Sequence, residues 1–294
     1  MKGIVIKLNG EEVPYQSFVI KESFNQLITE IVVGMYQDVF DNPVDIQGSQ
    51  FIKIAGETSS NGVLKSTFWP KMVVDLLNKQ FEPINKTATF EEIAKQYGIQ
   101  LMMQFKSTPS YWCLPQMKLI KFFDEARNRI IVSGGGGTVM TFSFNGKLRV
   151  VDLKKVAESN DAIAIFGTMK LATENMKWLA NVPASYKVSK VSIEQPLKEY
   201  DLKFGDNLGK GSMTHIYFNE KSIDTLDQEA TNIFYRKFFT SRVWHYEDIQ
   251  VAQELYPGCL IEDVQSKTKM VLYETELSGT QEFTTLKILG VNKP

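Results

Sequence analysis

The strongest candidate for a chemical site in this chain is the glycine-rich segment 133–138, which reads Ser-Gly-Gly-Gly-Gly-Thr. Glycine-rich loops can bind phosphate through their backbone amides. This loop lacks the lysine that a P-loop carries beside its last glycine, and we predict a strand after it where a phosphate-binding helix should begin. We therefore interpret it as a flexible connector between a helix and a hairpin.

The chain has only two histidines, His215 and His245. Neither has a second His or a Cys at a metal-ligand spacing, and a closed zinc site usually needs four such ligands. A Ser-His-Asp triad would have to use one of the two, and the chain has no GxSxG nucleophile elbow. We interpret the residues around His245, Val243–Glu247, as an aromatic packing cluster.

Carboxylates are abundant, but their spacing selects no acid-base pair. Asp38, Asp41 and Asp45 alternate through a turn without the glycine and terminal Glu of a calcium loop, so we interpret them as turn formers. Glu91 and Glu92 are better explained by a helix cap. A carboxylate pair for glycoside cleavage stays open as an alternative.

Tyr111 and Trp112 are either an exposed aromatic site for a sugar or peptide, or a buried anchor for the helix that follows; we favour the anchor. Cys113 and Cys259 are too few for a disulfide framework, and we expect two reduced, partly buried thiols. The sequence therefore predicts no catalytic residue, no cofactor and no metal site, and it does not identify partner-binding residues.

The composition is that of a globular protein. The chain has 294 residues, 43% of them hydrophobic and 23% charged, which excludes a mainly disordered chain. Its 33 Lys+Arg against 34 Asp+Glu give no basic excess of the kind that nucleic-acid binders carry. No stretch reaches the roughly 18–20 apolar residues that cross a bilayer, and the N-terminus is not a signal peptide. We expect a soluble protein made in the cytoplasm.

Three stretches that differ in predicted secondary structure must position these residues. Residues 1–85 read as short strands with turns, including an Asn9-Gly10 hairpin signal, and predict a small antiparallel barrel or sandwich with a short helix over 71–80. Residues 161–294 return to strands, with Tyr186–Ile193 alternating at period two and one helix over 222–239.

The middle stretch, 86–160, predicts a small α/β unit. Thr89 and Glu92 form a capping box, and Gly98 suits the left-handed end of the helix they start. An extended segment over 99–105, a second helix over 116–129 and a hairpin around Asn145-Gly146 follow. The fold class is thus mainly β (α+β): two small antiparallel β-barrel domains, 1–85 and 161–294, flank an α/β insert.

Two sets of segments carry a resemblance to a known family. The first resembles the α/β insert of bacteriophage tail-hub (baseplate hub) proteins and comprises Thr89–Ile99, the strand after it, Ser107–Trp112, Pro115 with the helix over 116–129, and the hairpin around Asn145-Gly146. The second resembles the closing part of that family's second barrel and comprises Leu255–Ile261, Met270–Leu277 and Phe283–Leu289.

The resemblance implies a structural virion protein that does no chemistry. Such hubs are homotrimers whose six barrels form a ring of pseudo-sixfold symmetry between the tail tube and a central spike, similar to the base of type VI secretion spikes. It implies as partners further copies of the chain, a tail tube or tube-initiator protein, a separate central spike protein and other baseplate proteins. It implies no membrane and no specific nucleic-acid partner. Because the sequence stops soon after the second barrel, we expect no fused spike or muramidase.

Two other readings compete. The segment Thr89–Ile99 also resembles the opening of a peptidoglycan-binding LysM unit, which would need a second helix within about a dozen residues; a strand there favours the hub. The third reading is a cell-wall hydrolase of a phage tail that works through a carboxylate pair.

Overall fold

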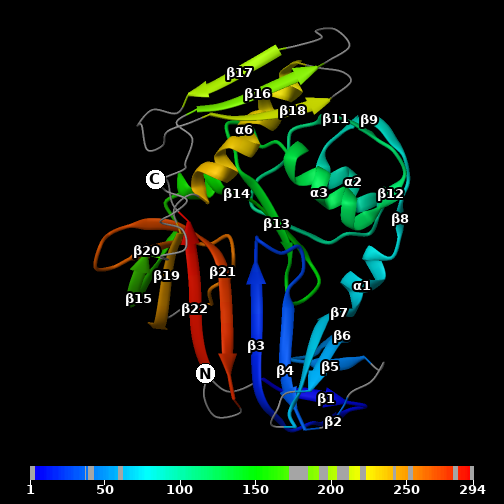
Figure 1. Cartoon of the computed structure of the whole chain (residues 1–294), viewed down its shortest axis with the longest axis vertical. Coiled ribbons are helices and arrows are strands. Elements are labelled where there is room, and N and C mark those ends of the chain that lie inside the picture. Colours follow the sequence, from blue (N-terminus) through cyan, green and yellow to red (C-terminus); the bar gives the residue numbers. More distant parts are fainter. Residues whose placement is uncertain are drawn as a thin grey trace.

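A computed structural model describes residues 4–36, 38, 43–58, 62–171, 185–191, 198–203, 212–218, 223–240, 243–250, 254–280 and 284–291. Its strands are β1 (Ile6–Leu8), β2 (Glu11–Glu12), β3 (Tyr15–Ser23), β4 (Glu30–Met35), β5 (Val44–Ile46), β6 (Ser49–Thr58), β7 (Leu64–Pro70), β8 (Gln80–Phe81), β9 (Ile84–Ala88), β10 (Leu101–Met103), β11 (Ser110–Leu114), β12 (Met117–Lys118), β13 (Thr138–Phe142), β14 (Leu148–Asp152), β15 (Ala162–Leu171), β16 (Ser185–Val191), β17 (Lys198–Lys203), β18 (Ser212–Phe218), β19 (Val243–Gln250), β20 (Leu260–Asp263), β21 (Lys269–Gly279) and β22 (Thr284–Val291). Its helices are α1 (Lys71–Leu77), α2 (Phe90–Gln96), α3 (Leu119–Arg129), α4 (Leu153–Ala157) and α6 (Ile223–Phe239). The prediction of a mainly β fold is confirmed (Figure 1).

Twelve strands from both ends of the chain form one sheet in the order β2-β1-β5-β6-β7-β4-β3-β21-β20-β15-β19-β22. An additional pairing of β21 with β22 closes the last five strands into a ring, a small barrel. The first seven strands curl around a core of their own, which holds Phe18, Ile31, Val33, Phe51 and Phe68. Both β-rich ends predicted from the sequence therefore enclose separate cores within one continuous sheet.

The two ends repeat the same strand pattern. In the N-terminal half, β3 pairs with β4, β4 with β7, β7 with β6 and β6 with β5, all antiparallel. In the C-terminal half, β15 pairs with β19, β19 with β22, β22 with β21 and β21 with β20, again all antiparallel. Taken in chain order, β3, β4, β5, β6 and β7 thus correspond to β15, β19, β20, β21 and β22.

The halves join through β3 and β21, which pair from Ser23 opposite Glu274 to Phe18 opposite Gly279. We call this ladder the seam. β21 is 11 residues long, and its first residues, Lys269–Val271, pair with β20 before the strand continues alongside β3. One long strand therefore belongs to the C-terminal barrel and to the seam (Figure 1).

Local sequence signals account for the turns. Asn9 and Gly10 have φ values of 52° and 87°, as a two-residue hairpin turn needs, and Lys7 faces Glu12 across it. The hairpin β13–β14 forms around Asn145-Gly146 as predicted. The short helix expected over 71–80 is α1, and the helix expected over 222–239 is α6.

The insert has the predicted helix, strand, helix and hairpin. The Thr89 side chain accepts the Glu92 N–H at 3.3 Å, and the Glu92 carboxylate accepts the Thr89 N–H at 2.8 Å, which is a complete capping box. Gly98 follows α2 with φ +69°. β10 then pairs parallel to β14. A strand thus lies where a LysM unit would need a second helix, and the LysM reading loses its support.

Trp112 is the anchor of the insert core. Its side chain is fully buried, its Nε1 donates to the Ala88 carbonyl at 3.0 Å, and its ring centroid lies 6.1 Å from that of Phe122 on α3. The buried-anchor interpretation is confirmed for Trp112, which excludes an exposed aromatic site at this residue, whereas Tyr111 is only half-buried. The same core includes Val73, Leu76 and other side chains from α1, β8 and β9.

The remaining elements are a helix that packs on the insert and a separate three-stranded sheet. α6 lies against α3, and β16–β18 form a separate sheet in the order β17-β16-β18, at the upper end of the molecule in Figure 1. No helix in the described part of the chain is long and apolar enough to cross a membrane.

The capping box yields a stability prediction. Thr89→Ala removes the oxygen that accepts the Glu92 N–H, and we expect a loss of about 1 kcal/mol in the free energy of unfolding, measured by urea denaturation. Thr87→Ala, on the exposed surface of neighbouring β9, is the matched control. Equal losses in the two variants would contradict the capping role.

Candidate assembly interface

The glycine-rich segment 133–138 joins α3 to β13, as predicted, but it is packed against protein. Both carboxylate oxygens of Asp152 accept the Gly136 N–H, at 2.7 and 2.9 Å, and Oδ1 also accepts the Lys155 N–H at 3.0 Å as the N-cap of α4. Burial raises the pKa of Asp152, against these hydrogen bonds. An internal carboxylate therefore occupies the amide that a bound phosphate would use.

The reason for glycine in this segment is close packing. A Cβ at Gly136 would lie less than 3.0 Å from the ring of Tyr235 on α6, and one at Gly135 would lie less than 3.0 Å from the Asp152 carboxylate. Gly137 has φ +79° and lies against the backbone of Arg236. The glycines let α6 approach the insert, a role the flexible-connector prediction missed.

The two histidines lie in different sheets, His215 in β18 and His245 in β19. His245 faces Lys170 and Leu289 across its two ladders, and its neighbour Tyr246 is fully buried, so burial raises the tyrosine pKa. No group of three or more His, Cys, Asp or Glu side chains suited to a metal occurs among the residues that the structure describes.

The predicted turn carboxylates separate into different roles. The Asp45 carboxylate accepts the Gly48 N–H at 2.8 Å and holds the β5–β6 turn, as predicted. Asp38 instead forms an ion pair with Lys53 at 2.5 Å. Asp41 lies outside the described residues.

Glu91 and Glu92 have separate partners. Glu92 completes the cap, as predicted, while the Glu91 carboxylate accepts the Ser107 N–H at 2.8 Å and ties the loop after β10 to α2. Cys113 and Cys259 are reduced thiols, as expected, half-buried and buried respectively, and burial raises the pKa of Cys259.

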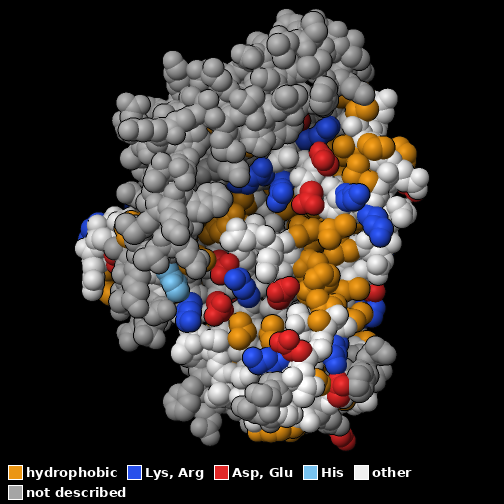
Figure 2. Space-filling model, in the orientation of Figure 1, with side chains coloured by type: hydrophobic (Ala, Val, Ile, Leu, Met, Phe, Trp, Pro, Cys, Tyr) orange, Lys and Arg blue, Asp and Glu red, His pale blue; other side chains and the backbone are white. Residues whose placement is uncertain are grey.

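One face of the sheet carries a row of alternating charges across the seam. Glu30 of β4 lies opposite Lys21 of β3, Lys21 opposite Glu276 of β21, and Glu276 opposite Lys287 of β22. Lys21 also forms an ion pair with Glu274 at 3.0 Å. Figure 2 shows acidic and basic side chains interspersed over these four strands. Cross-strand pairs of opposite charge favour this register by ~0.2–1 kcal/mol each.

On the other face, three parts of the chain meet at a buried ion pair. Arg149 of β14 donates to the Glu22 carboxylate of β3 at 3.2 Å, with side chains 9% and 12% exposed. The other Glu22 oxygen accepts the Phe144 N–H at 2.6 Å. The Arg149 guanidinium lies 4.5 Å from the ring centroid of Tyr256, which belongs to the C-terminal half. We call these contacts the junction; they connect the N-terminal half, the insert and the C-terminal half.

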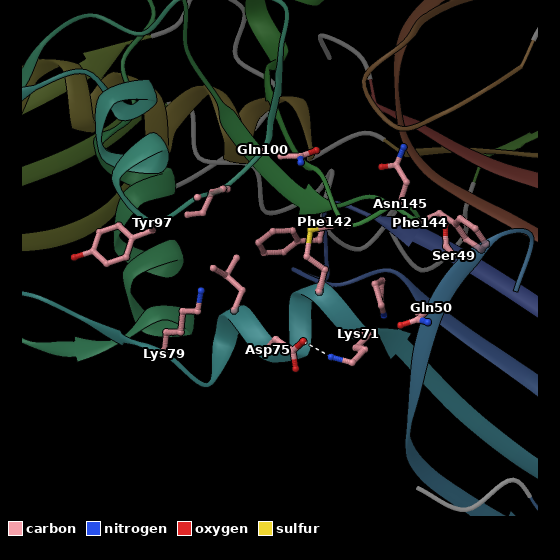
Figure 3. Close-up of a pocket in the computed structure, with 16 residues that line it drawn as sticks. Ser49, Gln50, Lys71, Asp75, Lys79, Tyr97, Gln100, Phe142, Phe144 and Asn145 are labelled. Atoms are coloured by element: carbon pink, nitrogen blue, oxygen red, sulfur yellow. Dashed lines mark hydrogen bonds and ion pairs between the residues drawn. The ribbon is translucent and has the colours of Figure 1, made fainter. Parts of the chain in front are cut away.

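Two hollows flank the hairpin β13–β14. A cleft of about 820 Å³ at the junction is lined by Glu22 and Arg149 and by apolar side chains such as Ile20 and Leu277. A groove of about 500 Å³ lies between α1 and the hairpin tip (Figure 3). Its charged side chains include Lys71 and Asp75, which pair with each other at 2.6 Å. Among the lining residues that the structure describes, neither hollow has a histidine or a cysteine.

Sequence reasoning missed the residues that join the three parts. Asn232 of α6 donates through Nδ2 to the carbonyls of Arg127, Asn128 and Ile130 at the end of α3, at 2.9, 3.1 and 3.0 Å. The Arg127 and Asn128 carbonyls lie in the last turn of α3, where helix geometry leaves carbonyls without a partner inside the helix. Neither Asn232 nor the Glu22–Arg149 pair stands in a local motif, because each acts on residues about a hundred positions away.

Comparison with known proteins gives a consistent result at the level of fold. No protein-family model and no curated protein matches the chain. The fold does match solved structures along its whole length. A tail protein from Neisseria meningitidis superposes with a TM-score of 0.69 at 11% identity, covering 98% of this chain and 96% of that one. Prophage tail protein gp18 from Listeria monocytogenes gives 0.60 at 11% identity, covering 99% and 94%.

The chain has the fold of phage tail proteins. The 43 kDa tail protein of prophage MuSo2 from Shewanella oneidensis adds a TM-score of 0.59 at 12% identity, covering 100% of this chain and 99% of that one. An Escherichia coli component of the type VI secretion system, described as similar to T4 tail proteins, gives 0.54 at 10% identity, covering 98% and 77%. These likenesses agree with the fold that the tail-hub resemblance implies.

The junction yields a double-mutant prediction. Arg149→Met or Glu22→Gln alone leaves one buried charged or polar group without its partner, and we expect each to cost ~3–5 kcal/mol of unfolding free energy. The double variant should recover part of that loss, as measured by urea denaturation. Lys71→Met, which breaks an exposed pair, should cost no more than about 1 kcal/mol. Strictly additive losses in the double variant would show that Glu22 and Arg149 act independently.

The glycine segment yields a packing prediction. Gly136→Ala places a methyl group against the Tyr235 ring and should destabilise the fold by ~1–3 kcal/mol, because the ring belongs to a packed helix and has to shift. Gly56→Ala is the control, since its new methyl would press on the flexible end of the Lys53 side chain and otherwise make an ordinary contact with Ser66. Thermal unfolding followed by circular dichroism measures both, and a Gly136→Ala variant as stable as the control would refute this reason for glycine.

Proposed function

We propose that this chain is a non-enzymatic structural protein of a phage virion, the homotrimeric hub of the tail baseplate. In this proposal its two β-rich halves, repeated in three copies, form a ring of pseudo-sixfold symmetry that connects the tail tube to the central spike. The observation that carries the proposal is the internal repeat within a phage-tail fold: β3–β7 and β15–β22 follow the same pairing pattern.

The repeat gives a physical reason for a trimer. A ring that meets a six-fold tube on one side and a three-fold spike on the other needs six similar wall units that belong to three chains. Two equivalent halves per chain supply this number. The insert, present once per chain, then marks the three-fold side.

The same proposal fixes the organisation and the partners. Its units are residues 1–85, 86–160 and 161–294, with the insert in the middle. Its partners are two further copies of the chain, a tail tube or tube-initiator protein, a central spike protein and other baseplate proteins. The protein would be made in the host cytoplasm and function in the virion tail, with no membrane and no specific nucleic acid as a partner.

The first test is the mass of the protein in solution by light scattering, with electron-microscope class averages of the same peak. We expect a mass three times that of the 33.5 kDa chain and a ring with a central channel. A compact monomer that also fails to form rings with its tail partners would contradict the hub. Zymography on peptidoglycan provides the control for the hydrolase reading: clearing that disappears when one carboxylate is mutated would replace the structural role with an enzymatic one.

A further inference from the structure

A further cleft, of about 460 Å³, lies where the insert meets the C-terminal barrel. Residues of α3, α6, β13, β19, β21 and β22 and of the turn between β3 and β4 line it. Its apolar wall includes Phe24 and Phe123. Its charged lining residues, among those that the structure describes, are Arg127, Arg236 and Asp124. The cleft therefore combines an apolar wall with an excess of one positive charge.

The contact between α3 and α6 sets the positions of both arginines. Asn232 Nδ2 donates to the Arg127 carbonyl at 2.9 Å, which holds the backbone of the last turn of α3. Arg236 Nη2 donates to the Asn128 side-chain oxygen at 2.6 Å, which holds its guanidinium. Asn232 and Arg236 are four residues apart and so lie on one face of α6. Two helices thus bring two guanidinium groups to the wall of one cleft.

Tyr273 of β21 adds a buried hydroxyl to the same cleft. The residue is only 6% exposed, and no described residue forms a hydrogen bond with its hydroxyl. Buried tyrosine hydroxyls usually have a partner. Burial raises the pKa of Tyr273 to about 12, while the positive charges of Arg236 and Arg127 lower it, so the phenol stays protonated at neutral pH. A protonated phenol beside two guanidinium groups is a set of donors that suits an oxyanion.

The chain does not supply a buried carboxylate to these donors from the described lining residues. Asp124 lies 3.7 Å from the Arg127 guanidinium, but its side chain is 64% exposed, and exposed pairs of this kind contribute little. The junction differs, because there the buried Arg149 faces the buried Glu22 of the same chain. A carboxylate from another molecule would complete this cleft as Glu22 completes the junction.

The composition of the cleft favours a protein over a nucleic acid as the source of that anion. Nucleic-acid binding depends on many Lys and Arg contacts to phosphates, whereas this chain has a formal net charge of −1 and the cleft offers two cations. A sugar-phosphate backbone has no apolar group to place against Phe24, Leu27 and Phe123. An acidic residue flanked by apolar residues matches both parts of the lining.

We propose that this cleft binds an acidic segment of a partner protein, with a Glu or Asp carboxylate held by Arg127, Arg236 and the Tyr273 hydroxyl and a neighbouring apolar side chain against Phe24 and Phe123. Because the insert and the C-terminal half both line the cleft, the bound segment contacts both units at once. All of these groups belong to one copy of the chain, so the inference goes beyond the proposed ring and does not require the trimer.

The first experiment measures peptide binding by fluorescence anisotropy. The probe is a fluorescein-labelled hexapeptide of alternating leucine and glutamate, and a leucine–glutamine peptide is its uncharged control. The acidic peptide should bind about tenfold more tightly than the control, a difference of ~1.4 kcal/mol. Arg127→Gln and Tyr273→Phe should each weaken its binding about tenfold, because each removes a hydrogen bond to a charged group.

Lys121→Gln is the matched control for the loss of charge. Lys121 is exposed on the same helix as Arg127 and does not line the cleft, so its substitution should leave the affinity unchanged. Asp124→Asn should have the opposite effect and strengthen binding about threefold, since it removes a carboxylate that competes for Arg127. Circular dichroism confirms that each variant is folded.

Three results would overturn the inference. The wild-type protein could bind both peptides equally, or the Arg127→Gln and Tyr273→Phe variants could bind the acidic peptide as tightly as the wild type. Single-stranded DNA that binds more tightly than the peptide, and is weakened by the same two substitutions, would replace the protein segment with a phosphate backbone. A trimeric ring that fails to bind the peptide contradicts this inference alone, and a monomer that binds it contradicts the hub alone.

Discussion

The pairing of β3 with β21 is the constraint on which the rest of this structure depends. It joins strands from opposite ends of the chain, so it forces the two β-rich halves into one sheet and places the insert above their common boundary. β3 is held in this position by side-chain contacts on both of its faces. Lys21 takes part in the row of alternating charges, while Glu22, one residue on, points to the opposite face and binds Arg149 of the insert.

The buried Glu22–Arg149 pair has a cost that its surroundings offset. Removing two charges from water is unfavourable, and Arg149 Nε has no hydrogen-bond partner among the described residues. The Phe144 amide and the Tyr256 ring compensate in part, since they bind the carboxylate and the guanidinium respectively. A buried ion pair of this kind adds little net free energy to folding, but it requires one specific geometry. It fixes one arrangement of three units that apolar contacts alone would hold with less precision.

An internal repeat organises the sheet. Each half of the repeat contributes one strand to the seam, β3 from the N-terminal half and β21 from the C-terminal half. The packed glycines beside Tyr235 and the Asn232 cap attach α6 to the insert.

The sequence by itself determined the elements that local physics specifies: the Asn9-Gly10 turn, the Thr89–Glu92 capping box, the strand after α2, the hairpin around Asn145-Gly146 and the mainly β class with its α/β insert. Each depends on residues close together in the chain, where propensity, turn geometry and periodicity act. Only the tertiary structure decided the seam register, the Glu22–Arg149 pair and the approach of α6 to the glycines. Those contacts join residues far apart in sequence. No local pattern predicts which strand another strand will pair with, or which buried charge will bind which partner.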